Sequence, residues 1–293
     1  MKKHKICKIL LVILAIFLCV AFYELLGICV AYKKQPEVSN TTKKETKNGS
    51  WNECSENTER AVIIEKNPEA LLQRVRLIKN AKKEIILSTF AFQSDESGKL
   101  ILGALHDAAD RGVHIRLLVD GMESWIDMEG NPYFYGLSSH ENVEIKLYNK
   151  ANPLKPWKMM GRMHDKYLIA DGKRYILGGR NTYNYFLGDF PGHKNYDRDV
   201  LVVCDEPEKE NSVNQLLEYF ETIWEQEDSG YFHDNKKLAN RKSVKNAVLE
   251  LQNGYQKYFE ENKERICDTD YTDETFETEK IALVSNPIHT GSK

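Results

Sequence analysis

Six residues within an eighteen-residue stretch have side chains suited to chemistry at phosphorus. They are His164, Lys166, Asp171, Gly178, Gly179 and Asn181. A neutral imidazole can attack phosphorus as a nucleophile, while an ammonium group and an amide N–H can bind the phosphate oxygens. Glycine, which has no Cβ, lets the backbone approach a phosphate closely. The combination predicts covalent catalysis on a phosphodiester whose phosphate is bound by Lys166, Gly178, Gly179 and Asn181.

The local sequence predicts that these residues meet at one end of a hairpin. In a strand over residues 166–170, the alternation of side chains puts His164 and Lys166 on the same face. Residues 171–172 (Asp-Gly) predict a tight turn into a second strand over residues 175–177. The Gly-Gly-Arg-Asn segment that follows the second strand is therefore expected to return close to His164.

This pattern, H-x-K-x4-D-x6-G-G-x-N, resembles the signature of the phospholipase D superfamily and matches it at every motif position. Over about residues 58–229 the surrounding sequence is most similar to bacterial cardiolipin synthases. The features that carry this similarity are Asn152-Pro153, Arg162-Met163-His164, Gly178-Gly179-Arg180-Asn181 and residues 195–200. The resemblance implies a phospholipase D-like α/β fold.

The resemblance also implies a role for each motif residue. His164 is the nucleophile that forms a phosphohistidine, while Lys166 and Asn181 stabilise negative charge on the phosphate. Asp197 aligns with an acidic residue of the family that holds the far ring nitrogen of the histidine and fixes its tautomer. Asp171 belongs to the signature, although its place in the turn suggests a structural role. Neither a metal ion nor another cofactor is implied.

In the family, the leaving group is protonated by the histidine of a second H-x-K motif. None of the other seven histidines of this chain is followed two residues later by lysine. Residues 278–287 resemble residues 58–68, so the chain is expected to hold the first of two repeats and the start of another, as in a shortened or split gene product. Two partners stay open: a second copy of the chain, paired as a homodimer, or a separate chain that supplies the second motif.

A basic stretch precedes the motif in a chain whose net charge is only −3. Residues 146–166 hold six Lys or Arg and a single acid, Asp165. Mixed with apolar side chains, these cations predict a surface that contacts a bilayer and its anionic headgroups. The predicted membrane patch comprises Lys150, Lys155, Trp157, Lys158 and Arg162. The near-neutral overall balance argues against nucleic acid as a partner.

An apolar run near the N-terminus predicts a transmembrane helix. Residues 9–32 carry one charge, Glu24, and 24 residues are enough to cross a hydrocarbon core of about 30 Å. The lysines of residues 1–8 predict a cytoplasmic tail by the positive-inside rule, with the rest of the chain outside the cell membrane. A cleaved signal peptide is the alternative, but the run exceeds the usual apolar core of about 7–15 residues.

Beyond the anchor, the sequence predicts a flexible linker over residues 33–57 and a catalytic domain over residues 58–229. Alternating strand and helix patterns predict an α/β domain with a mostly parallel or mixed sheet flanked by helices. Residues 122–139 are expected to form a loop. Residues 230–293 are expected to form a helical and acidic linker before the incomplete second repeat.

Three functions stay open on this evidence. The first is a membrane-anchored phosphatidyltransferase, which transfers a phosphatidyl group between phosphatidylglycerol molecules through phosphohistidine. The second is a phosphodiesterase that uses water as acceptor and acts on phospholipid or nucleic acid. The third is an inactive or half-enzyme binding partner. An anionic phospholipid substrate and the membrane are the partners expected for the first function.

Overall fold

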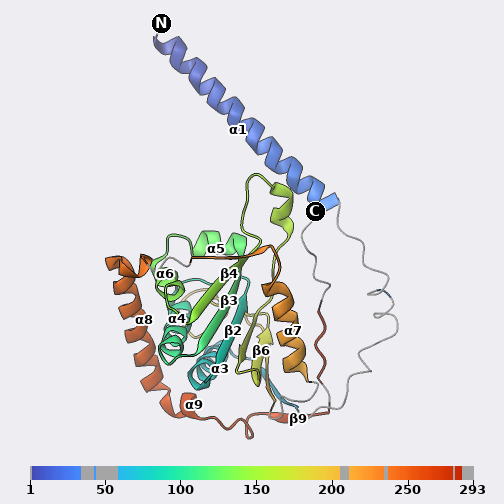
Figure 1. The fold of residues 1–293 in the computed structure, drawn as a ribbon, viewed down its shortest axis with the longest axis vertical. Helices are drawn as coiled ribbons and strands as arrows, with labels where there is room; N and C mark the ends of the chain where they lie inside the picture. The colour runs from blue at the N-terminus through green and yellow to red at the C-terminus, as the bar shows by residue number, and fades with distance from the viewer. Residues whose placement is uncertain are drawn as a thin grey trace.

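The structure, a computed structural model, describes residues 2–33, 43, 59–204, 211–233, 237–279 and 281–285. One long helix projects from an α/β domain (Figure 1). The helices are α1 (Lys2–Lys33), α3 (Asn67–Asn80), α4 (Glu96–Asp110), α5 (Gly121–Asp127), α6 (Pro132–Ser138), η2 (Pro156–Met160), α7 (Ser212–Trp224), η3 (Leu238–Asn240), α8 (Lys242–Glu261) and α9 (Lys263–Cys267). The strands are β1 (Glu59–Ile64), β2 (Glu84–Thr89), β3 (His114–Asp120), β4 (Val143–Tyr148), β5 (Tyr167–Ala170), β6 (Arg174–Gly178), β7 (Asp199–Cys204), β8 (Ser229–Tyr231) and β9 (Phe276–Thr278).

The strands of the described residues form a single mixed sheet in the order β8-β4-β3-β2-β5-β6-β7-β1-β9. Strands β2, β3 and β4 are parallel, because α4 and then α5 with α6 connect them as crossovers. The other pairings are antiparallel. The predicted mixed sheet flanked by helices is confirmed, but antiparallel pairing predominates. The reason is that β5, β6 and β7 follow one another without a crossover helix between them.

Helices cover both faces of the sheet. One face packs against α3, α4 and α6 through a large apolar cluster that α8 covers from outside, and the other packs against α7 (Figure 1). The smaller cluster under α7 contains Leu216, Phe220 and Trp224, which lie on one stripe of that helix. The sheet is therefore the middle layer of an α/β/α sandwich, and the ends of its strands remain free to carry a site.

The predicted loop over residues 122–139 contains two short helices instead. The Asp120 carboxylate caps α5 by accepting hydrogen bonds from Met122 N and Glu123 N. Asn131 caps α6 in the same way, with Pro132 at the first helical position. Gly, Pro and Asn indicate loops when they stand alone, but they also mark helix starts. The prediction of a continuous loop is therefore wrong, because residues that cap two helices were taken as loop residues.

The folded domain also extends past residue 229, where the sequence predicted a linker. α8 buries Val244, Ala247, Leu251, Tyr255 and Phe259. The spacing of three and four residues forms one stripe, which packs against α4 and α6. The C-terminal helices therefore pack onto the same core as the residues before the predicted boundary at residue 229.

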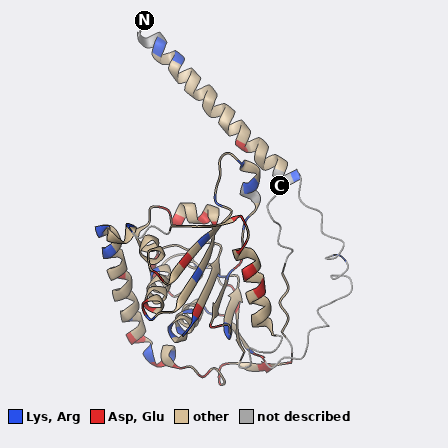
Figure 2. Cartoon of the chain, in the orientation of Figure 1, with Lys and Arg blue, Asp and Glu red and all other residues tan. Residues whose placement is uncertain are grey.

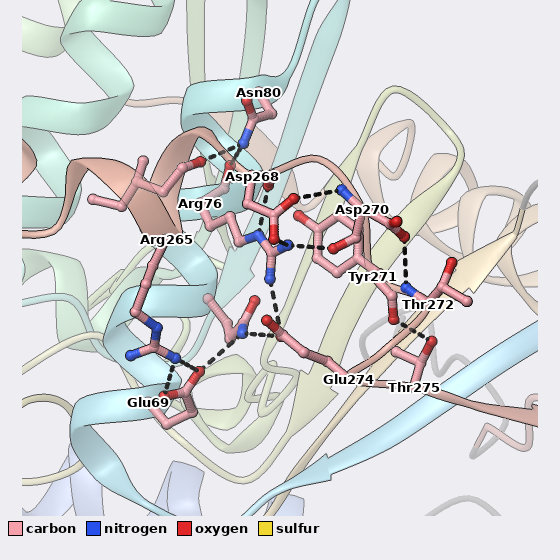
Figure 3. Close-up of polar contacts among 12 residues, drawn as sticks. Glu69, Arg76, Asn80, Arg265, Asp268, Asp270, Tyr271, Thr272, Glu274 and Thr275 are labelled. Atoms are coloured by element: carbon pink, nitrogen blue, oxygen red, sulfur yellow. Dashed lines mark hydrogen bonds and ion pairs between the residues drawn. The ribbon is translucent and has the colours of Figure 1, made fainter.

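The acidic segment after α9 is likewise part of the fold rather than a solvated linker. It surrounds the guanidinium of Arg76, a side chain of α3 that is 1% exposed (Figure 3). Glu274 Oε2 lies 2.9 Å from Arg76 Nη1, and the Tyr271 ring centroid lies 3.9 Å from Arg76 Cζ. The backbone oxygens of Asp268 and Asp270 accept two further hydrogen bonds from Arg76. Two acids of this segment, Asp268 and Glu274, thus neutralise a buried cation.

The described part of the predicted second repeat adds to this same sheet. β9 pairs with the edge of β1, and Leu283 N donates a hydrogen bond to Gln215 Oε1 of α7. Residues 286–293, and almost all of the predicted linker over residues 33–57, lie outside the described residues.

α1 is the one helix of the described residues that is long and apolar enough to cross a membrane, with mean hydropathy 2.9 over its best window. Figure 2 shows that it is almost without charged side chains. Its C-terminal part packs against η2, where the missing side chain of Gly27 makes room for Pro156. Tyr23 Oη also donates a 2.8 Å hydrogen bond to Leu154 O. The helix is therefore attached to the domain near the predicted site.

Candidate active site

The strand order brings the predicted site residues to one end of the sheet. Because β5 is antiparallel to β2 and β6, the residues before β5 lie beside those that follow β2 and β6. His164 and Lys166 precede β5, and Lys166 O accepts a hydrogen bond from Gly178 N at the end of β6. The hairpin predicted from the sequence therefore has the expected geometry.

His164 is exposed at this end and contacts an aromatic ring. Its ring centroid lies 4.6 Å from that of Phe90, the residue that follows β2, in an edge-to-face arrangement. Partial burial and, next, the positive charge of Lys166 lower the pKa of His164 below its usual value of 6.5. The imidazole is therefore mostly neutral at neutral pH, which is the form that can act as a nucleophile.

Lys166 is 6% exposed and lies against the same aromatic ring. Its Nζ donates a 2.6 Å hydrogen bond to His164 O and lies 5.3 Å from the Phe90 ring centroid. Burial lowers the pKa of Lys166 to about 8, although the charges of Asp165 and Asp197 oppose the shift. Among the described residues this ammonium forms no ion pair with a carboxylate, so a phosphate oxygen would find its charge available.

Asp120 fixes the segment that carries His164, and the sequence analysis did not single it out. Its carboxylate is 1% exposed at the end of β3 and forms a 2.7 Å ion pair with Arg162. It also accepts a 3.1 Å hydrogen bond from Met163 N, the residue before His164. Asp120 thus holds in place both the start of α5 and the segment that leads to His164.

The side chain of Asn181 lies beside Ala91 and already forms hydrogen bonds within the chain. Its Oδ1 accepts a 3.2 Å hydrogen bond from Ala91 N, and its side chain also bonds Tyr183. Arg180, between the glycines and Asn181, is 1% exposed and turns inward to form an ion pair with Asp199. The amide of Asn181 is therefore placed at the site by the loop, while Arg180 holds that loop to the core.

The two glycines pack against carboxylates. A Cβ on Gly179 would lie 2.0 Å from Asp197 Oδ2, and one on Gly178 would lie 2.0 Å from Asp199 Oδ1. The sequence analysis expected these glycines to admit a phosphate, whereas the space beside them is filled by the residues that lead into β7. Close chain packing therefore requires a glycine at both positions, and their role in binding phosphate stays a prediction.

Asp197 is half-buried and close enough to Lys166 to influence its pKa. Its Oδ1 accepts a hydrogen bond from Arg198 N. Within the described ranges, no hydrogen bond between Asp197 and His164 is present, so the orienting role expected for this carboxylate stays a prediction.

Asp171 lies at the opposite end of β5 from His164. It has a positive φ of 55°, and its carboxylate accepts hydrogen bonds from the backbone N–H groups of Lys82, Lys83 and Glu84. Asp171 thus ties the β5–β6 turn to the start of β2. The structure separates it from the other motif residues and gives it a structural role.

The predicted membrane patch lies between α1 and the site, but much of its charge is neutralised. Lys158 forms a 2.9 Å ion pair with Asp228, and Arg162 pairs with Asp120 and Glu123. Lys150 donates a hydrogen bond to Tyr231 O. Lys155 is exposed, and Trp157 is half-buried in η2 beside α1. The patch is therefore a loop held against the apolar helix in which Lys158 and Arg162 are neutralised, while Lys150 and Lys155 form no ion pair with the described residues.

Sequence reasoning missed Phe90 and Asp120. Phe90 directly follows β2 and Asp120 ends β3, and the carboxyl ends of both strands lie at the site. Their places at strand ends were therefore the sequence signal that could have identified them. Across the described part of the chain, three or more His, Cys, Asp or Glu side chains that could hold a metal ion do not come together.

Comparisons with known proteins identify the fold and its relatives. A family model described as "Cardiolipin synthase, PLD-like domain" matches residues 74–224, just over half of the chain. An uncharacterized protein of Helicobacter pylori strain J99 is 30% identical over 212 residues, which cover 67% of this chain and 39% of that protein. Cardiolipin synthase C of Escherichia coli K12 is 29% identical over 54% of this chain and 34% of its own length. This chain therefore spans well under half the length of these relatives.

A solved structure supports the same fold. The phosphatidylserine synthase of Haemophilus influenzae superposes with a TM-score of 0.50 at 17% identity. The match covers 75% of this chain and 48% of that one.

Proposed function

Since this chain belongs to the family of phospholipase D-like cardiolipin synthase domains, we propose that it is a membrane-anchored phosphatidyltransferase with His164 as its nucleophile. It moves a phosphatidyl group from one phosphatidylglycerol molecule to another. The observation that carries the proposal is the pairing of an exposed imidazole, His164, with the buried ammonium of Lys166 at one end of the sheet.

In the first step, a nitrogen of the neutral His164 ring attacks the phosphorus of phosphatidylglycerol. A P–N bond forms and the P–O bond to the headgroup glycerol breaks. The oxygen of the departing glycerol takes a proton from a second imidazolium. The lowered pKa of His164 supports this step, because the ring stays neutral at neutral pH. Lys166 and Asn181 stabilise the negative charge on the non-bridging oxygens.

In the second step, a hydroxyl of another phosphatidylglycerol attacks the phosphohistidine. Its proton passes to the second imidazole, the P–N bond breaks, and cardiolipin leaves. Two phosphatidylglycerol molecules thus give one cardiolipin and one glycerol. A second copy of this chain, related by a twofold axis, supplies the second imidazole, and a separate chain with its own H-x-K motif is the alternative partner.

The apolar helix supports a membrane location. Lys5 and Lys8 stand at its N-terminal end and favour a cytoplasmic start, which puts the catalytic domain outside. Protease protection in sealed vesicles and spheroplasts tests this orientation, since only an outside domain is cleaved in intact spheroplasts.

Hydrolysis is the second candidate, and the exposure of His164 favours it. Water that reaches the phosphohistidine can replace the lipid hydroxyl as acceptor. The product would then be phosphatidic acid rather than cardiolipin.

The deciding experiment incubates the purified full-length chain with phosphatidylglycerol vesicles and analyses the lipids by mass spectrometry. We expect cardiolipin and glycerol from the wild type and no product from His164→Ala. His114→Ala is the matched control, because His114 begins β3 at the opposite end of the sheet, and it should retain activity.

Each outcome distinguishes the candidates. Phosphatidic acid alone identifies a hydrolase. Turnover by a folded His164→Ala protein contradicts the nucleophile assignment. The chain is an inactive half-enzyme if the folded wild type gives no product, carries no phosphatidyl group on a histidine and is only monomeric in solution.

A further inference from the structure

A cavity of about 560 Å³ lies between α1 and the end of the domain that carries the site. Its size is within the range of about 300–1,000 Å³ that small-molecule sites occupy. Its lining includes Glu24, Ile28, Met122, Trp125, Lys150 and Ala151. One wall is therefore the apolar helix itself, and another is α5, whose cap is Asp120.

The helix wall is held in place by specific contacts. Gly27 lies against Pro156, and Tyr23 Oη bonds Leu154 O at 2.8 Å. Glu24, Gly27 and Ile28 are partly buried and have the spacing of one helix face. Glu24, the only charged residue between residues 9 and 32, therefore faces the domain and the cavity. An ionisable residue in an apolar span that faces protein in this way is a mark of function.

The opposite wall connects the cavity to the nucleophile. Glu123 of α5 forms a 2.9 Å ion pair with Arg162, which also pairs with Asp120. Arg162 lies two residues before His164 and stacks over Phe90, with 5.0 Å from its Cζ to the ring centroid. The helix that lines the cavity is thus bonded directly to the segment that carries the candidate nucleophile.

Two exposed apolar side chains extend the cavity outward on α5. Trp125 and Ile126 are each 65% exposed, although their neighbours Gly121 and Ser124 are buried. Trp side chains favour the boundary between a bilayer and water. Since α1 forms the facing wall, a ligand can reach this cavity from the bilayer without leaving an apolar surface.

We infer that this cavity binds the acyl-chain end of a membrane glycerophospholipid and presents its phosphate to His164. The inference rests on the proposed function and adds to it a lipid site that the anchor helix completes. Ile28, Met122 and Trp125 contact the chain, and Lys150 at the same cavity attracts the anionic headgroup. The anchor is then a wall of the substrate site as well as an attachment to the membrane.

Photolabelling in bilayers tests the inference without requiring turnover. The full-length His164→Ala protein is reconstituted with phosphatidylglycerol that carries a diazirine in one acyl chain. After irradiation, mass spectrometry maps the labelled peptides. We expect label on the domain-facing positions of α1 near Ile28 and on α5 near Trp125. Label confined to α1, with none on α5, overturns the inference.

A substitution that fills the cavity supplies the second arm. Ala151 lines the cavity, so Ala151→Trp should reduce labelling of α5 by about ten-fold, the change that about 1.4 kcal/mol of lost binding energy produces. Leu154→Trp is the matched control, because Leu154 is 77% exposed and lies outside the lining. Undiminished labelling in Ala151→Trp contradicts the inference. If the expected labelling occurs but the wild type makes no product, the lipid site stands and the transferase proposal fails.

Discussion

The Asp120 carboxylate and the Arg162 guanidinium form a 2.7 Å ion pair at the carboxyl end of β3. The same carboxylate accepts a hydrogen bond from Met163 N. Two consecutive residues before His164 are therefore held by one buried side chain from a strand more than forty positions earlier in the sequence. Asp120 is a positioning residue, since it acts through the backbone and through Arg162.

Replacing this carboxylate should reduce catalysis more than substrate binding. In Asp120→Asn the charge that holds Arg162 is lost, and we expect kcat to fall by about 10–100-fold with a smaller change in KM. Steady-state kinetics on phosphatidylglycerol vesicles measure both constants. Glu123→Gln is the control, because it removes only the outer partner of Arg162 and should have a several-fold smaller effect. Equal effects of the two substitutions would contradict the positioning role.

The rate should fall at both low and high pH. Protonation removes the proposed nucleophile below the pKa of His164, which is lowered from 6.5, so the acid limb lies below pH 6.5. On the alkaline side, the proposed mechanism loses the second imidazolium that protonates the leaving glycerol, and above the pKa of Lys166, about 8, it also loses the cation proposed to bind the phosphate. Since kcat/KM reports the free enzyme, it should be at least about ten-fold lower at pH 9 than at its maximum.

The variant Lys166→Arg identifies the group behind the alkaline limb. Arginine keeps its charge throughout this range, so the component of the fall near pH 8 should disappear, and only the component due to the second imidazolium should remain. An alkaline profile that is unchanged in Lys166→Arg would contradict the assignment to Lys166.

The two glycines should respond differently to alanine. A Cβ on Gly179 meets the mobile end of Asp197, whereas one on Gly178 also meets backbone, at 2.5 Å from Arg198 O. We expect Gly178→Ala to lower the free energy of unfolding by about 1–3 kcal/mol. Gly179→Ala should keep most of its stability but lose activity because it displaces Asp197. The double variant Gly179→Ala/Asp197→Ala should then be no less active than Asp197→Ala alone.

Arg76 should matter for stability. Its guanidinium is buried and contacts Glu274, Asp268 and Tyr271, so Arg76→Met leaves carboxylates without their cation. The carboxylates of Asp268 and Glu274 are 50% and 40% exposed, so we expect the free energy of unfolding to fall by only about 2–3 kcal/mol. Thermal unfolding of the full chain in micelles measures the loss. Arg265→Met, which removes a more exposed pair with Glu69, should cost less than about 1 kcal/mol.

The sequence predicted the parts of the fold that depend on local spacing. The strand that precedes Asp171, the turn at that residue and the returning strand all have the predicted order. The caps of α5 and α6 were mistaken for a loop, because a helix of seven residues has too few positions to show a period. The apolar stripe of α8 was visible in the sequence, but its partners on α4 lie far away along the chain.

The site was predictable where its residues are neighbours in sequence. His164 and Lys166 are two positions apart, so strand alternation alone related them. Phe90 and Asp120 reach the same place only through the pairing of β2 with β5 and of β2 with β3, which no local pattern reveals. The neutralisation of the basic stretch was unpredictable for the same reason, because the acids that pair with Lys158 and Arg162 come from other elements.

The packing of Gly27 against Pro156 has a kinetic consequence. With α1 in the bilayer, as we propose, a domain held to it by this contact meets lipid by lateral diffusion, so encounters depend on lipid molecules per unit area rather than per unit volume. Diluting phosphatidylglycerol with an inert neutral lipid in the same bilayer should therefore slow each enzyme. Diluting the enzyme-containing vesicles in buffer should leave the turnover rate of each enzyme molecule unchanged.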